Sequence, residues 1–103
     1  MPDKNRVLSR EYLVETIRSL LLKYHAQTGI LFGSYAREEA GRLSDIDLMV
    51  IGGDAFEPTD VFCLADDLHR ITGKEVDVYE VCEIDPDSGF YQTILKEGVR
   101  IAA

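Results

Sequence analysis

The sequence predicts an α/β (α+β) domain in which a small mixed β-sheet is flanked by helices. Stretches with helical spacing of apolar residues alternate along the chain with short apolar or two-residue-periodic stretches. Glycines separate most of these stretches, as expected where one element ends and another begins. The length of 103 residues fits a single domain spanning residues 1–103.

The first half of the chain should contain two helices around one strand. Ser9 is a plausible N-cap for a helix over about residues 10–25, where apolar side chains follow helical spacing. Residues 30–32 are expected to form a short buried strand. Residues 35–40 then read as a short helix that Gly41 ends.

The second half should contain a central strand, a helix, a half-buried strand, a last helix and an edge strand. Residues 45–51 end in a continuous apolar run, typical of a central strand. Residues 75–81 alternate with period two. The last helix should reach about Glu97, and residues 99–101 should form the edge strand. A helix should begin at residues 58–60, between the strands at residues 45–51 and 75–81. Its expected apolar face comprises Val61, Phe62, Leu64, Ala65, Leu68 and Ile71.

Charge and composition exclude several classes of function. Eleven basic and nineteen acidic residues give a net charge of -8, which argues against direct nucleic-acid binding. The polar N-terminus has no secretory apolar segment, and no apolar run approaches the ~20 residues of a membrane span. We therefore expect a cytoplasmic protein without a membrane segment. Cys63 and Cys82 are expected to be buried thiols rather than a disulfide framework.

Three aspartates are candidate metal ligands. Asp45 and Asp47 lie two residues apart on a predicted strand, so their side chains share one face. Close carboxylates repel unless a cation lies between them, and a divalent metal prefers oxygen ligands. Asp77 joins the pair if the two strands are adjacent, and three carboxylates can hold two Mg²⁺ ions. Taken alone, one Asp-x-Asp pair is more commonly a solvated strand end.

A turn between the first strand and the next helix is a candidate phosphate site. Gly33 lets the backbone approach a phosphate closely, and Ser34 adds a hydroxyl donor. Arg37 lies within one helical turn and can reach the same anion. A Gly-Ser pair by itself usually marks only a turn, so the prediction rests on its combination with the aspartates.

This combination of motifs resembles a known signature. Residues 33–37 (GSYAR), seven further residues and then residues 45–48 (DIDL) resemble the DNA polymerase β-like nucleotidyltransferase superfamily. The chain is more closely similar to the minimal nucleotidyltransferases (MNT), antitoxins that are paired with HEPN-domain toxins. The resemblance covers nearly the whole chain and implies the polymerase β-like nucleotidyltransferase fold.

The resemblance implies a function and a role for each candidate residue. Such antitoxins transfer AMP from ATP to a tyrosine of the HEPN ribonuclease, which implies a hetero-oligomer. By position, Gly33 and Ser34 would hold the β- and γ-phosphates, and Asp45 and Asp47 would bind both Mg²⁺ ions. Asp77 would complete the catalytic metal site and help deprotonate the tyrosine hydroxyl.

One position departs from the family pattern and keeps alternatives open. The family usually has glycine after the motif arginine, where this chain has Glu38. Its carboxylate could weaken triphosphate binding or point to solvent. An active AMP transferase is therefore weighed against an antitoxin that neutralises the toxin by binding, with little or no catalysis. A nucleotidyltransferase acting alone on small molecules is disfavoured, because the chain has no room for an acceptor domain.

Overall fold

Four strands form one mixed sheet with the spatial order β3-β2-β1-β4. The computed structural model describes residues 6–103, and residues 1–5 of the polar N-terminus lie outside the described range. The strands are β1 (Thr28–Phe32), β2 (Ile46–Ile51), β3 (Val76–Glu80) and β4 (Val99–Ala102). The helices are α1 (Arg10–Lys23), α2 (Asp60–Thr72), the single 3₁₀ turn η1 (Val81–Glu83) and α3 (Gly89–Glu97).

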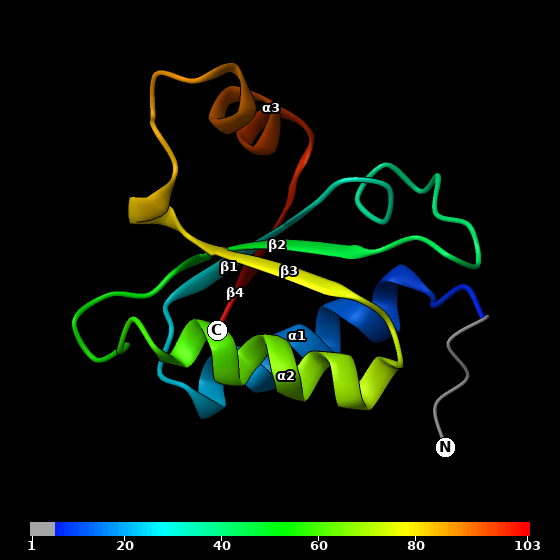
Figure 1. Ribbon diagram of the computed structural model, residues 1–103, viewed down its shortest axis with the longest axis horizontal. Helices are drawn as coiled ribbons and strands as arrows, with labels where there is room; N and C mark the ends of the chain where they lie inside the picture. The colour runs from blue at the N-terminus through cyan, green and yellow to red at the C-terminus, as the bar shows by residue number, and fades with distance from the viewer. Residues whose placement is uncertain (1–5) are drawn as a thin grey trace.

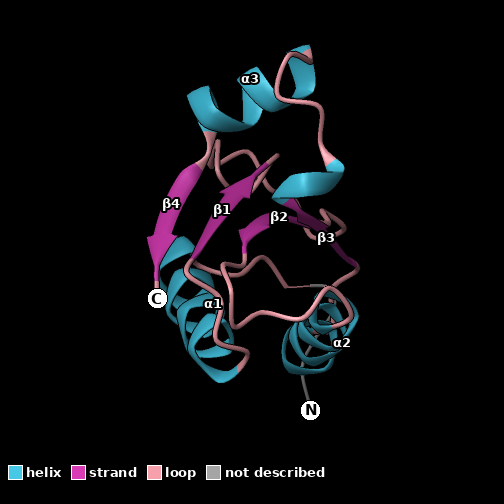
Figure 2. Ribbon diagram, turned by 90° about the vertical axis from the view of Figure 1, so that its left-hand side faces the viewer, coloured by secondary structure: helices cyan, strands magenta, loops and turns pink. Residues whose placement is uncertain are grey.

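The sheet combines two antiparallel pairs with one parallel pair. β1 runs antiparallel to both β2 and β4, and β2 runs parallel to β3. Helix α2 makes the crossover that a parallel pair requires. Figures 1 and 2 show α1 and α2 together on one face of the sheet and α3 alone on the other. The predicted mixed sheet with flanking helices is confirmed.

The face covered by α1 and α2 carries the larger part of the core. Ser9 caps α1, since its Oγ accepts a hydrogen bond from the Tyr12 amide at 3.1 Å. Both helices present apolar stripes to the sheet, and their side chains join alternate residues of the strands. The fully buried members include Leu13, Ile17, Leu21, Leu31, Ile46, Leu48, Leu64, Leu68 and Ile101.

The opposite face has a smaller core beneath α3. Its buried members are Ile30, Phe32, Met49, Ile84 and Ile94. Every residue of β1 is buried, which fits a strand covered on both faces. β4 lies at one edge of the sheet, as predicted for the last strand.

The short helix predicted over residues 35–40 does not form, so Gly41 ends no helix. The chain makes tight turns there, in which the Arg37 amide donates to the Gly33 carbonyl at 3.2 Å. Glu38 then adopts a positive φ of 58°, which a right-handed helix cannot contain. A helix of six residues would gain very few hydrogen bonds to offset the unfavourable free energy of helix nucleation, so separate turns are favoured.

Two further predictions about burial are wrong. Phe62 is 75% exposed and Ile71 is 42% exposed, because the buried stripe of α2 runs through Val61, Leu64 and Leu68. Cys63 and Cys82 are exposed free thiols rather than buried ones. Within residues 6–103, no helix is long and apolar enough to cross a membrane.

Candidate functional site

Gly33 occupies a position that only glycine fits, at the end of β1. Its φ is +75°, in the left-handed region that favours glycine. A Cβ at this position would overlap Oδ2 of Asp47 and lie 3.2 Å from its Cγ. The turn therefore brings backbone directly against the Asp47 carboxylate. The amides available to a phosphate here belong to a turn, not to a helix N-terminus as predicted.

Two of the three aspartates lie on neighbouring strands, whereas Asp45, predicted to lie on the same strand as Asp47, falls just before that strand. β2 and β3 are adjacent, and Asp47 and Asp77 are direct partners in the parallel register. Asp45 precedes β2 by one residue and is exposed, as is Asp77, whereas Asp47 is half-buried. Asp47 pairs with Phe32, a member of the core beneath α3, so Asp47 and its partner Asp77 belong to the face that α3 covers.

The electrostatics of Asp47 reflect this crowding. Burial raises the pKa of Asp47, and the negative charges of Asp77 and Asp45 raise that pKa further. The guanidinium of Arg37 acts in the opposite direction. Burial likewise raises the pKa of Tyr79, with Asp77 and Asp47 adding to the effect. The site is thus a pocket of negative potential, which a bound cation would relieve.

Arg37 and Ser34 flank the Gly33 turn. Arg37 donates from Nε to Glu39 Oε2 at 3.0 Å and lies 3.6 Å from Glu97 of α3. Its side chain is 41% exposed, so the guanidinium keeps access to solvent. Ser34 is half-buried, and its carbonyl accepts from the Glu39 amide at 2.9 Å. Both residues lie within the turn that follows Gly33.

Gly33, Arg37 and Asp47 open onto one pocket of about 290 Å³ between the sheet and α3. Sequence reasoning missed most of its apolar wall. Phe90 packs edge-on against Phe32 and Tyr79, with ring centroids 5.6 and 5.8 Å apart. Phe90 stands in the first turn of α3, and no sequence spacing linked it to Asp47. Only the fold of α3 over the sheet brings them together.

The oxygen donors suit a hard divalent cation, although they do not form a closed cage. Among residues 6–103, no three His, Cys, Asp or Glu side chains converge closely enough to hold an ion. Mg²⁺ commonly binds through one or two carboxylates and completes its shell with water and substrate phosphates. An open set of carboxylates beside a glycine turn fits that mode of binding.

Glu38 does not face the pocket. Its carboxylate is 70% exposed and lies 3.6 Å from Arg10 of α1. Of the two possibilities left open by the sequence, the structure supports a carboxylate that points away from the phosphate site. The departure from glycine therefore affects the backbone, because φ at Glu38 is +58°.

The glycine turn and the paired aspartates lie together on one face of a four-stranded mixed sheet. The chain matches the family described as polymerase beta, nucleotidyltransferase, over residues 15–103. It belongs to that family and is a nucleotidyltransferase. A candidate protein adenylyltransferase of Methanocaldococcus jannaschii is 40% identical over 67 residues, which cover 65% of this chain and 72% of the relative.

Two solved structures place the fold among toxin–antitoxin proteins. A toxin–antitoxin structure with AMP-PNP is similar with a TM-score of 0.73 and 26% identity, over 85% of this chain and 71% of that chain. An MNT antitoxin complex with the tri-AMPylated HEPN toxin of Shewanella oneidensis is similar with a TM-score of 0.68 and 22% identity. That match covers 89% of this chain and 71% of the other, and it supports the fold.

Proposed function

We propose that this protein is an antitoxin that transfers AMP from ATP to a tyrosine of a partner HEPN-domain toxin and thereby neutralises it. One observation carries the proposal: Asp47 and Asp77 stand in register on adjacent strands, with Gly33 packed against Asp47. The nucleotide-bound toxin–antitoxin structure and the adenylyltransferase relative support the same reaction. The proposal places the pair in the cytoplasm, where ATP is supplied.

The residues around the pocket would have different roles in binding the nucleotide. The open backbone at Gly33 and the hydroxyl of Ser34 would bind the β- and γ-phosphates. Arg37 would contribute positive charge to the same group while its Glu39 and Glu97 contacts hold its position. The aromatic wall would exclude water from the reacting atoms.

The carboxylates would organise the transfer itself. Asp45 and Asp47 would hold two Mg²⁺ ions, with Asp77 completing one of the sites. These ions supply charge neutralisation for the triphosphate. Asp77 would also accept the proton of the incoming tyrosine hydroxyl, whose ordinary pKa is about 10. The phenolate oxygen then bonds to the α-phosphorus, and pyrophosphate leaves.

The reaction is tested by intact-mass spectrometry of the toxin. The toxin is incubated with this protein, ATP and Mg²⁺, and we expect its mass to rise by one or more AMP groups. Asp47→Asn should prevent the increase, and chelation of the metal should do the same. An unchanged toxin mass with active nucleotide binding would contradict the proposal.

The alternative is an antitoxin that acts by binding alone. It predicts that Asp47→Asn still protects cells from the toxin. The outward orientation of Glu38 removes the structural reason for expecting weakened chemistry. We therefore expect the Asp47→Asn variant to lose protection while its complex with the toxin persists in size-exclusion chromatography.

A further inference from the structure

A groove of about 510 Å³ lies between the start of α2 and the end of β3. It is separate from the pocket at Asp47. Val78 belongs to the core beneath α1 and α2, whereas Tyr79 and Phe32 belong to the core beneath α3. The groove therefore opens on the opposite face of the sheet from the aspartates. Its apolar lining comprises Phe56, Pro58, Val61, Phe62, Val78 and Cys82.

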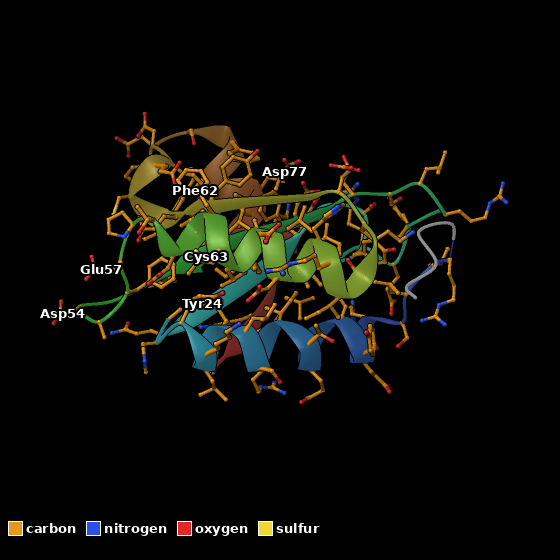
Figure 3. The ribbon with its side chains drawn as sticks, turned by 60° about the horizontal axis from the view of Figure 1, so that its bottom comes forward. Tyr24, Asp54, Glu57, Phe62, Cys63 and Asp77 are labelled. Carbon is orange, nitrogen blue, oxygen red and sulfur yellow. The ribbon has the colours of Figure 1, made fainter. Side chains whose placement is uncertain are left out.

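One apolar side chain of the lining, that of Phe62, is widely exposed to solvent. Phe62 stands in the first turn of α2 and is 75% exposed, whereas its neighbour Val61 is buried. Figure 3 shows Phe62 near the end of β3, with Asp54 and Glu57 on the loop that precedes α2. Exposed apolar grooves with polar rims commonly mark sites of protein association.

The groove adjoins the open edge of the sheet. β3 is the outermost strand next to β2. The Ile46 amide donates to the Glu75 carbonyl at 2.9 Å. The backbone N–H and C=O groups of odd-numbered residues in β3 therefore point toward β2, and those of even-numbered residues point away from the sheet. At the end of the edge, the Glu80 amide is capped by Glu83 Oε1 at 3.0 Å. The backbone of Val78 is left facing outward beside the groove, where an added strand could pair with it.

The charge around the groove selects the occupant. Residues 53–62 and 78–83, which supply the walls, contain Asp54, Glu57, Asp60, Glu80 and Glu83 but no Lys, Arg or His. A second copy of the chain would bring one acidic rim against another, and a nucleic acid would meet the same repulsion. A segment with Lys or Arg beside its apolar side chains would satisfy both the rim and the lining.

We propose that this groove is the docking site for an extended segment of a partner protein that carries apolar side chains together with Lys or Arg on the side facing the groove. The segment pairs with the outer edge of β3 at Val78. Its apolar side chains contact Phe62, and its cations contact Glu80 and Glu83. Because the groove and Asp47 lie on opposite faces of the sheet, docking does not depend on the transfer reaction.

Synthetic peptides test the proposal on the intact protein. The probe is the acetylated peptide Lys-Ser-Val-Ser-Val-Ser-Lys, whose lysines and valines share one side of an extended strand, and its binding is followed by amide chemical shifts in ¹⁵N spectra. One control peptide replaces every valine with serine, and another replaces every lysine with glutamate. We expect only the Lys/Val peptide to shift residues 56–62 and 78–83, with at least about tenfold tighter binding than either control.

Two variants assign the binding to the groove. Phe62→Ser should weaken the Lys/Val peptide about tenfold, whereas Leu43→Ser, which removes an 82% exposed apolar side chain elsewhere, should leave binding unchanged. The double variant Glu80→Gln and Glu83→Gln keeps local hydrogen-bond acceptors and should weaken binding about threefold at low salt. That difference should disappear at about 0.5 M salt.

Four outcomes would overturn the proposal. The first is an absence of shifts at the groove up to millimolar peptide. The second is equal binding by the control peptide without valine, which would indicate general charge attraction alone. The third is equal binding by the control peptide in which glutamate replaces lysine, which would show that the acidic rim does not select the segment. The fourth is concentration-dependent dimerisation that Phe62→Ser abolishes, which would make a second copy the occupant. Asp47→Asn should bind the peptide normally, so failure of the transfer reaction is distinguishable from failure of docking.

Discussion

The two faces of the sheet are built for different purposes. On one face, α1 and α2 bury a large apolar cluster that includes Leu13, Leu64 and Leu68 at full burial. On the other, the nine-residue α3 covers only a small cluster and leaves a pocket against Asp47. Charged groups in a fully packed face would cost several kcal/mol, so carboxylates concentrate where the cover is thin. The residues that stabilise the fold and the candidate catalytic residues therefore lie mainly on opposite faces of the sheet.

The largest difference between the faces should appear with Asp47→Asn. Removing this carboxylate should reduce AMP transfer at least about 10³-fold, or about 4 kcal/mol of the barrier. Stability should stay equal or rise at neutral pH. The raised pKa of Asp47 means that its ionised form is disfavoured by folding, a penalty that is present above the folded pKa and that asparagine removes. Initial rates and thermal unfolding measure both effects, and a large loss of stability would contradict the separation.

Cavity variants on the two faces sharpen the comparison. Leu64→Ala, beneath α2, should cost about 3 kcal/mol of unfolding free energy with little change in nucleotide affinity. Ile94→Ala, equally buried beneath α3, should cost about 2 kcal/mol because it borders an open pocket that can relax. It should also weaken AMP-PNP binding. Urea unfolding and calorimetric titration give both quantities, and equal binding losses would refute the distinction.

Gly33→Ala tests how closely the β1 turn must approach the carboxylate. The left-handed φ should cost about 1–2 kcal/mol of stability. The new methyl group would displace Asp47 Oδ2, so activity should fall further than stability alone explains. Alanine at Gly41, where a Cβ meets nothing within 4 Å, is the matched control and should preserve activity.

The face of the sheet covered by α1 and α2 also has an ionic network, whose contribution to stability should decrease at acidic pH. The hydrogen bond from Lys23 and then that from Tyr24 lower the pKa of Asp67, with O···N and O···O distances of 2.8 and 2.5 Å. This stabilisation is present above the unfolded pKa of about 3.9 and is lost as pH falls through the folded pKa. Asp67→Asn should therefore cost about 1 kcal/mol at pH 7 and progressively less below about pH 4. Denaturant unfolding across this range should show the two curves converging.

The smallest effect should come from Glu38→Gly. Glycine relieves the positive φ, partly offset by its greater freedom in the unfolded chain, for a net gain of about 0.5 kcal/mol. Glu38→Ala keeps the strain and serves as the control, since it removes the same carboxylate. AMP transfer should be unchanged in both variants. Faster transfer in both would indicate that the carboxylate does reach the nucleotide.

Local patterns predicted most of the element order but not the details of the turns. Hydrophobic spacing is sufficient for α1, α2, α3 and the strands, because each has an apolar face to bury. The spacing of Asp45 and Asp47 predicted that both lie on one strand, whereas β2 begins only at Ile46. The turn at residues 34–38 depends on the Gly33 conformation and on tertiary packing. A local helical pattern carries no information about either.

The parts of the site that come from distant segments were beyond sequence reasoning. The in-register pairing of Asp47 with Asp77 was conditional on strand order, which periodicity does not specify. Phe90 reaches the pocket only because α3 folds back over the sheet. Phe62 was assigned to the same apolar helix face as Val61, although a shift of one residue turns a helical side chain by about 100°.

The most direct test of the division between the two faces is a titration of the ¹⁵N-labelled protein with AMP-PNP and Mg²⁺. We expect the amides of Gly33, Ser34, Asp47 and Asp77 to shift together, and Asp47→Asn to abolish the response. Amides of α1 and α2 should remain unchanged. Shifts confined to α1 and α2, or an undiminished response in Asp47→Asn, would contradict the assignment of nucleotide chemistry to the α3 face.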